Sequence, residues 1–297
     1  MKEHLLDPEI LAQIDSFSLL ARTVVEGFIS GLHKSLYHGF GSEFVHYRHY
    51  YPGDDLKYLD WKVYARSNKF HIKVFQEETN CNSYIVLDTS ASMGYKGKNR
   101  KISKIDYAKM IVACLSYLVS RQGDNVGFYT YGEQLDVCIK PGHRGGQVQN
   151  ICNNLATIQA NGACKHQETL YRLVEMFSRR GIIIFISDFL DVDEAFKKAI
   201  RYFRVAHHDC IVFQILDDDE LNFPFSDTAR FIDSESNTEI NTAPELVRER
   251  YLNAFHKYLD DFQGSCVNDN IEYFRFSTSQ SLANILAAYL HKREIFR

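Results

Sequence analysis

Apolar and polar positions change pattern repeatedly along this chain, and from about residue 80 the change becomes regular. Short apolar runs rich in β-branched and aromatic residues, such as Tyr84–Leu87 and Ile182–Ile186, alternate with longer stretches in which apolar residues recur at every third or fourth position. The short runs are typical of buried strands, and the longer stretches are typical of amphipathic helices. Their alternation predicts an α/β fold, with a doubly wound, mostly parallel sheet and helices on both of its faces.

The same patterns place the individual elements. We expect strands at Tyr84–Leu87, Val126–Tyr131, Leu135–Ile139, Ile182–Ile186, Cys210–Leu216 and Ile271–Ser277. We expect helices at about Ile105–Arg121, Gly146–Ile158, Thr169–Arg179, Val192–Ala206, Pro244–Phe262 and Ser281–Lys292. Because only Gly132-Glu133-Gln134 separates the second strand from the third, these two are predicted to form a hairpin at one edge of the sheet.

The segment before this alternation is predicted to hold one helix and a small β-rich region. Apolar residues recur at helical spacing from Asp7-Pro8, which can cap and open a helix, to about Gly31. The polar face of this helix has few basic residues, so we expect it to pack on the protein's own core rather than on a membrane. Between residues 37 and 78, many aromatic residues, a Pro52-Gly53 turn and an alternating run at Phe70–Phe75 predict strands. We therefore divide the chain into residues 1–79 and an α/β domain at residues 80–297.

Composition and charge exclude several classes of protein. The chain has 297 residues, 45% hydrophobic and 24% charged content and a formal net charge of -4, which gives no reason to expect nucleic acid or an anionic membrane as a partner. No apolar run approaches the roughly 20 residues of a membrane-spanning helix. The acidic start argues against a secretory signal, and seven dispersed cysteines without a Cys-x-x-Cys pair indicate neither a disulfide framework nor a zinc site. We expect a cytoplasmic protein.

Oxygen-bearing side chains follow the first predicted strand of the α/β domain. Asp88, Ser90 and Ser92 occupy alternate positions in the loop directly after Tyr84–Leu87. In an open α/β sheet, ligands bind at the carboxyl ends of the strands. Hard oxygen donors on one side of a loop suit a small cation such as Mg²⁺. The loop is therefore a candidate site for a divalent cation.

Two hydroxyls and one carboxylate cannot complete the coordination of such a cation, so further ligands are expected from other strand ends. Asp188 follows the predicted strand Ile182–Ile186, and Thr169 stands at the start of a predicted helix. Glu168, beside Thr169, is an alternative oxygen donor. The predicted metal ligands are Asp88, Ser90, Ser92, Thr169 and Asp188.

The order of these residues resembles the metal-ion-dependent adhesion site (MIDAS) of von Willebrand factor type A (vWA) domains. The resemblance implies that Ser90, Ser92 and Thr169 contact the metal directly or nearly so, whereas Asp88 and Asp188 act largely through water. It also implies that an Asp or Glu of a partner protein fills the open coordination position. Mg²⁺ is the expected cation, with Mn²⁺ and Ca²⁺ as alternatives.

Motifs on both sides of residue 80 resemble those of a bacterial family catalogued as the fifty-eighth domain of unknown function. The motifs are Gly39-x-Gly41-x-Glu43-Phe44, Arg48-x-Tyr50, Gly53-Asp54-Asp55, Leu59-Asp60-Trp61-Lys62, Ala65-Arg66 and Ser187-Asp188-Phe189-Leu190-Asp191. The resemblance implies action beside a MoxR-type AAA+ ATPase, in the assembly or maturation of other proteins.

Three functions follow from this site. The first is a non-enzymatic interaction module that binds a partner's carboxylate through the cation. The second is a Mg²⁺-dependent hydrolase or phosphotransferase with Asp88 as nucleophile; it is disfavoured because Ser90 stands where such sites usually carry a second carboxylate, and because no Gly-x-Ser-x-Gly or Walker A sequence is present. The third is a scaffold with a relict site.

Two further charged segments lie outside the predicted site. The loop at residues 95–101 carries four positive charges, and it is either a surface that steers an acidic partner or a plain solvated loop. Asp217-Asp218-Asp219-Glu220 follows another predicted strand and could bind a cation, but because the run is local we expect an exposed acidic turn. His207 and His208 have no spaced companion, so we expect packing or surface roles for them rather than metal ligation.

Overall fold

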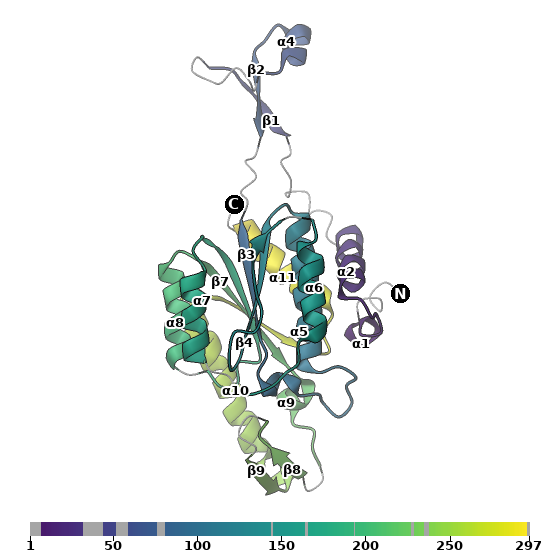
Figure 1. The fold of residues 1–297 in the computed structure, drawn as a ribbon, viewed down its shortest axis with the longest axis vertical. Coiled ribbons are helices and arrows are strands. Elements are labelled where there is room, and N and C mark those ends of the chain that lie inside the picture. The colour runs from purple at the N-terminus through teal and green to yellow at the C-terminus, as the bar shows by residue number, and fades with distance from the viewer. Residues whose placement is uncertain are drawn as a thin grey trace.

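A six-stranded sheet forms the centre of the computed structural model, which describes residues 7–31, 44–51, 59–75, 81–143, 145–163, 166–192, 194–226, 229–234 and 238–295. The strand order is β10-β7-β6-β3-β4-β5, and every neighbouring pair is parallel except β4 and β5 (Figure 1). The bounds are β3 Asn82–Asp88, β4 Asn125–Tyr131, β5 Cys138–Gly142, β6 Gly181–Ser187, β7 Asp209–Leu216 and β10 Glu272–Ser277. The predicted α/β class and its mostly parallel sheet are confirmed.

Helices cover both faces of the sheet. One face carries α5 (Lys104–Arg121), α6 (Gln147–Thr157) and α11 (Leu282–Ile295), and the other carries α7 (His166–Met176), α8 (Glu194–Val205) and α10 (Pro244–Asn268). Side chains alternate between the two cores along β3, because successive residues of a strand point to opposite faces. Ile85 and Leu87 pack with α5, whereas Tyr84 and Val86 pack on the opposite side. The sheet is therefore buried on both faces, which is why its strands contain continuous apolar runs.

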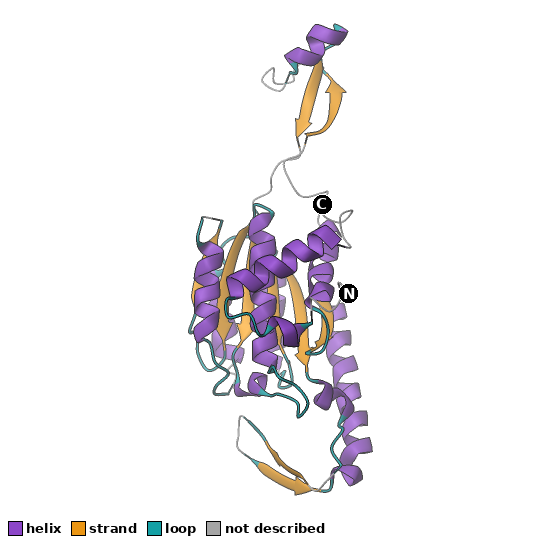
Figure 2. Cartoon of the chain, turned by 90° about the vertical axis from the view of Figure 1, so that its right-hand side faces the viewer, coloured by secondary structure: helices purple, strands orange, loops and turns teal. Residues whose placement is uncertain are grey.

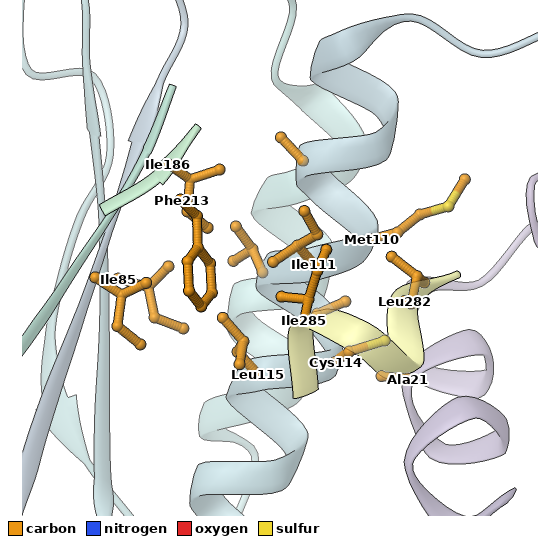
Figure 3. Packing of buried hydrophobic residues seen from close by; sticks show 14 of the residues in the cluster. Ala21, Ile85, Met110, Ile111, Cys114, Leu115, Ile186, Phe213, Leu282 and Ile285 are labelled. Atoms are coloured by element: carbon orange, nitrogen blue, oxygen red, sulfur yellow. The ribbon is translucent and has the colours of Figure 1, made fainter. Parts of the chain in front are cut away.

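The N-terminal helix packs on the α/β core, as expected. Figure 3 shows Ala21 of α2 (Phe17–Gly31) facing Cys114 of α5, with the sheet on the other side of α5. The predicted single helix is in fact two. The first, α1 (Pro8–Leu11), ends at Leu11, and α2 begins anew with a hydrogen bond from the Leu20 N–H to the Ser16 carbonyl. The boundary at residue 80 stays a prediction, although α2 belongs to the same core as α5.

A small separate unit contains β1 (Phe44–His49), β2 (His71–Phe75) and α4 (Trp61–Ser67), and is drawn apart from the sheet in Figure 2. Strands were predicted here, and the two that the structure describes pair antiparallel, but the helix was not predicted. Asp60 caps it by accepting hydrogen bonds from the backbone N–H groups of Lys62 and Val63, which explains why it starts there. The predicted turn at Pro52-Gly53 lies outside the described residues.

Other differences from the expected elements are local. The edge hairpin is confirmed, but β5 begins three residues later than Leu135 and continues through Pro141, which an edge strand tolerates because one side of it has no partner. Three elements near the sheet's carboxyl end were not predicted: α9 (Asp218–Asn222), β8 (Ala229–Ile232) and β9 (Glu239–Thr242). Among the helices that the structure describes, none is both long and apolar enough to cross a membrane.

Candidate functional site

The two central strands, β3 and β6, end side by side at a point where the chain changes direction across the sheet. From β3 the chain proceeds to β4 and β5 on one side, whereas β6 leads to β7 and β10 on the other. Ligands bind at such switch points in open α/β sheets, because the connections leave a crevice at the carboxyl ends of the strands. Leu87 pairs with Ile186, so Asp88 and Ser187 follow at neighbouring positions. This end is the lower one in Figure 1, where α9 is labelled.

Asp88 is held in one orientation by two hydrogen bonds. The Ser90 backbone N–H donates to its Oδ1 at 2.8 Å, and the Ser187 hydroxyl donates to its Oδ2 at 2.6 Å. The Ser90 and Ser92 hydroxyl oxygens lie 3.1 Å apart. We call Asp88, Ser90 and Ser92 the open half of the site. The alternate spacing of its three residues therefore gathers their oxygens, as predicted from the sequence.

The carboxyl of Asp88 is buried, at 2% exposure, yet no Lys, Arg or His in the described ranges forms an ion pair with it. Burial, and then the negative charge of Asp188, raise the pKa of Asp88 to about 6. Hydrogen bonds from Ser187 and from the backbone and side chain of Ser90 oppose that rise without preventing it. At neutral pH the open half therefore carries a negative charge that no positively charged side chain in the described ranges neutralises.

Asp188, in contrast, has a cation beside it. The Lys104 ammonium donates to Asp188 Oδ2 at 2.7 Å and to Glu220 Oε1 at 2.6 Å, and its side chain is fully buried. We call Lys104, Asp188 and Glu220 the closed half of the site. Burial opposes the charge on Lys104, but the two carboxylates outweigh it and raise the pKa of Lys104 above its ordinary value. Lys104 is therefore an ammonium in the folded protein.

The position of Lys104 in the chain makes this ion pair unexpected. Lys104 is the first residue of α5, directly after the N-cap Ser103. A positive charge is disfavoured there, because the helix dipole is positive at its N-terminus. The two carboxylates come from other elements, Asp188 from the end of β6 and Glu220 from α9. Tertiary contacts thus hold a charge that the helix itself disfavours.

One cavity of about 440 Å³ joins the two halves. Its lining includes all six residues of the open and closed halves, together with Ser187. Ile232 and the two residues after it, Asp233 and Ser234, contribute a further wall from the end of β8. The β8–β9 hairpin thus reaches the same cavity as the strand ends.

The structure brings four of the five predicted ligands to this cavity, namely Asp88, Ser90, Ser92 and Asp188. Thr169 lies in the first half of α7, is buried and lines a different cavity of about 210 Å³, together with Glu168 and three other residues. Neither Thr169 nor Glu168 lines the main cavity, so a ligand role for either stays a prediction.

The donor set of the main cavity fits a hard divalent cation of low affinity. In the part of the chain that the structure describes, no group of three or more His, Cys, Asp or Glu side chains is arranged to hold a metal. A cation here would depend on two serine hydroxyls, the Asp88 carboxylate and water. Mg²⁺ accepts such a set because it retains several waters of its own.

Sequence reasoning missed Lys104 and Glu220, and its interpretation of the acidic run was wrong. Asp217–Glu220 is no exposed turn: Asp217 caps α9 and also accepts a hydrogen bond from the Thr278 hydroxyl, and Asp219 is 9% exposed. Asp218 pairs with Arg100. The run includes an N-cap Asp followed three residues later by Glu220, which is the pattern of a capping box and could have indicated a helix.

The backbone of the basic loop at residues 95–101 is attached to the start of α9, whereas the side chains of Lys96, Lys98 and Lys101 are exposed. The backbone N–H of Gly97 donates to Asp217 at 3.3 Å, and that of Lys98 donates to Asp219 at 2.9 Å. A Cβ on residue 97 would collide with the Asp217 carboxylate, so the close approach requires glycine. This loop therefore forms one wall of the site through Tyr95.

Comparison with known proteins identifies relatives by sequence. The model of a family described as protein of unknown function DUF58 matches residues 46–258. An uncharacterized protein of Mycobacterium tuberculosis (strain ATCC 25618 / H37Rv) is 26% identical over 239 residues, which cover 77% of this chain and 72% of the relative. An uncharacterized protein of Mycobacterium bovis matches with the same values.

Several solved structures are similar at a low level. The conserved hypothetical protein BatB from Bacteroides thetaiotaomicron is 13% identical, with a TM-score of 0.47 over 73% of this chain and 100% of that chain. The VWA domain of SpRpn10 is 9% identical, with a TM-score of 0.41 over 70% of this chain and 94% of that chain. At these levels, the role of the site has to be inferred from the chain's own residues.

Proposed function

The chain belongs to the DUF58 family, and we propose that it is a non-enzymatic protein-interaction module that binds a divalent cation, Mg²⁺ first, at the open half of its site. Asp88, Ser90 and Ser92 hold the cation, and Asp188 orients water beside it. Thr169 completes the set if α7 brings its hydroxyl to the cation. A carboxylate of a partner protein then occupies the open coordination position.

One observation supports this proposal above the others: a buried carboxylate without a cation stands next to two hydroxyl oxygens at the sheet's switch point. Asp88 is 2% exposed, and among the described residues it accepts hydrogen bonds from Ser90 and Ser187 and forms no ion pair with a Lys, Arg or His. A buried ionised carboxylate is costly unless a positive charge accompanies it. A bound divalent cation would supply that charge and a Lewis-acid position for an incoming carboxylate.

The partner class follows from the same chemistry. A hard cation held by few protein oxygens gains most from an additional anionic oxygen ligand, which an Asp or Glu of another protein provides. We propose a MoxR-type AAA+ ATPase, or a client protein that it acts on, as the source of this residue. Ile232, at the cavity's rim and 48% exposed, supplies an apolar contact next to the charged one. A cytoplasmic location is part of the proposal.

The alternative function, a Mg²⁺-dependent hydrolase or phosphotransferase, would require Asp88 to attack a phosphorus atom. Both of its oxygens already accept hydrogen bonds, and Ser187 and the Ser90 backbone hold the carboxylate in the crevice. This arrangement suits an orienting group better than a nucleophile. Turnover of phosphate esters with Mg²⁺ that the Asp88→Asn variant loses would favour the enzyme instead.

Thermal unfolding with and without metal tests the proposal. The wild type is heated in EDTA and then in millimolar Mg²⁺ or Mn²⁺, beside Asp88→Asn and the control Asp136→Asn, whose side chain is exposed outside the cavity. A ligand that binds only the folded state raises its stability, by about 2.7 kcal/mol at 100 times its Kd. We expect a metal-dependent rise in midpoint for the wild type and the control, and none for Asp88→Asn.

A binding measurement then tests the partner. The protein is immobilised and a MoxR-type AAA+ ATPase is passed over it in Mg²⁺ and in EDTA. Binding that requires Mg²⁺ and is lost in Asp88→Asn supports the metal bridge. Binding that survives both chelation and the substitution would exclude it.

A further inference from the structure

We propose that Lys104 is a tethered competitor of the divalent cation: its ammonium holds Asp188 in the cation-free protein and thereby weakens cation binding at the site. The inference rests on the proposed function, because it concerns the same cation. It adds a regulatory element, since the cation has to act in a cavity where the chain has already placed a positive charge.

The geometry of the closed half carries this inference. The Lys104 ammonium lies within 2.7 Å of Asp188 Oδ2 and 2.6 Å of Glu220 Oε1, while 5.7 Å separates it from the centre of the Tyr95 ring. Two of its three N–H groups therefore serve carboxylates, and an aromatic ring lies on a further side. The ammonium is surrounded by the groups that a bound cation attracts.

Electrostatics then determines the direction of the effect. Asp88, Asp188 and Glu220 carry three negative charges and Lys104 carries one positive charge, so the two halves together sum to two negative charges when ionised. Asp191 and Asp233 bring two further carboxyls to the lining of the same cavity. An ammonium and a divalent cation a few ångströms apart repel each other strongly where water is largely excluded. Removal of the Lys104 charge should therefore strengthen cation binding, although it leaves two carboxylates without their partner.

A purely structural role for Lys104 predicts something different. In that case the ion pairs only connect α9 to the end of β6, and loss of Lys104 would lower stability without improving affinity for a cation. Affinity and stability are thus two separate readouts, and only a gain in affinity identifies a competitor.

Titration with Mn²⁺, followed by the electron paramagnetic resonance of the free ion, measures that affinity directly. The wild type is compared with Lys104→Met and with the control Lys109→Met. Lys109 is on the same helix and is also buried, but it pairs with Asp106 at 3.9 Å and does not line the cavity. We expect Lys104→Met to bind Mn²⁺ about tenfold more tightly than the wild type, or better, from the loss of charge repulsion, and Lys109→Met to bind as the wild type does.

A double variant keeps the inference testable if Lys104→Met does not fold. Lys104→Met with Glu220→Gln removes one charge of each sign, so the two halves together keep their net charge of two negatives while Asp188 loses its competing partner. Tighter Mn²⁺ binding than in the wild type supports the inference in this background too. Binding no tighter than the wild type overturns it.

The outcomes separate this inference from the proposed function. If the wild type binds Mn²⁺ and Asp88→Asn does not, the proposed function stands, and an unchanged affinity in both Lys104 variants overturns the competitor alone. If neither the wild type nor any Lys104 variant binds Mn²⁺, both proposals are wrong. Binding that becomes measurable only in the Lys104 variants supports the competitor and shows that Lys104 blocks the site in the free protein.

Discussion

The two halves of the site meet at the carboxyl ends of the adjacent parallel strands β3 and β6, and they differ in how their buried carboxylates are compensated. In the closed half, the Lys104 ammonium lies between Asp188 and Glu220. In the open half, Asp88 accepts hydrogen bonds from Ser90 and Ser187 but has no cation. The halves share one cavity, and the difference between them is the Lys104 ammonium, which contacts Asp188 and Glu220.

An external cation is expected to bind at the open half, where the buried carboxylate has no cation of its own. Burial of a carboxylate costs free energy that a hydrogen bond recovers only in part. In the closed half, the Lys104 ammonium offsets this free energy. In the open half, hydrogen bonds alone offset only part of it. A buried carboxylate without a compensating positive charge, at a switch point, favours the binding of an external cation, because the bound cation lowers the free energy of that buried charge.

The largest loss of stability is expected from a substitution that breaks the ion pairs of the closed half. Lys104→Met leaves two buried carboxylates without their cation, and we expect a loss of about 3–5 kcal/mol in the free energy of unfolding at pH 7 without divalent cations. Urea denaturation in EDTA measures it. Lys109→Met is the control, because its ion pair with Asp106 is long and partly exposed. Equal losses in the two variants would mean that the contacts of Lys104 with Asp188 and Glu220 stabilise the fold no more than an ordinary ion pair on the same helix does.

The next effect compares the halves directly, by neutralising one carboxylate in each. Asp188→Asn weakens a charge-assisted contact with Lys104, so we expect it to destabilise the cation-free protein by about 2 kcal/mol. Asp88→Asn removes a charge that has no partner, and we expect it to be near neutral or stabilising. The same denaturation experiment ranks them. A larger loss for Asp88→Asn than for Asp188→Asn would contradict the comparison.

The dependence of stability on pH sharpens the description of the open half. The pKa of Asp88 is raised from 3.8 to about 6 in the folded protein, so the folded state binds a proton more tightly than the unfolded state does. Between about pH 4 and pH 6 the unfolded state therefore loses this proton first, and stability falls as pH rises, by on the order of 3 kcal/mol. Above about pH 6 the loss is complete.

The measurement for this prediction is denaturation in EDTA at a series of pH values. The wild type minus Asp88→Asn isolates the contribution of this carboxyl from that of every other group. We expect the difference to grow from about pH 4 to about pH 6 and then stay constant. A difference that is flat over this range would mean that Asp88 titrates normally.

The sequence predicted that the residues of the open half converge, but it did not predict Lys104 or Glu220 of the closed half, and the reason is physical. Asp88, Ser90 and Ser92 lie in one short loop, so their convergence follows from local geometry once the preceding strand is recognised. Asp188 was found by the same rule. Lys104 at the start of α5 and Glu220 of α9 meet only in the folded chain, across 116 positions of sequence, which leaves no periodic pattern in the sequence. A lysine at the start of a helix is also ordinarily exposed, which hides its role.

The fold shows the same division between local and tertiary information. The strands of the sheet were predicted because burial on both faces makes them continuously apolar. The short helix α9, the β8–β9 hairpin and α4 were missed, since each is brief and is fixed by caps or contacts rather than by a long periodic pattern. Two of these missed elements line or support the site, so the least predictable parts of the chain shape the cavity.

The smallest effect on stability is expected from a substitution on the β8–β9 hairpin that leaves both halves of the site unchanged. Ile232 lines the cavity from the β8–β9 hairpin and is 48% exposed, so Ile232→Ser should change the free energy of unfolding by no more than about 0.5 kcal/mol. Mn²⁺ affinity should also stay at the wild-type value, because the side chain carries no charge and no oxygen. Partner binding should weaken by about 1 kcal/mol, or roughly fivefold, through the loss of apolar contact area.

Ile240→Ser is the matched control on the same hairpin, since Ile240 is exposed but does not line the cavity. An equal loss of partner binding in both variants would place the contact on the hairpin as a whole, and an altered Mn²⁺ affinity in Ile232→Ser would mean that the hairpin belongs to the cation site rather than to the partner's surface.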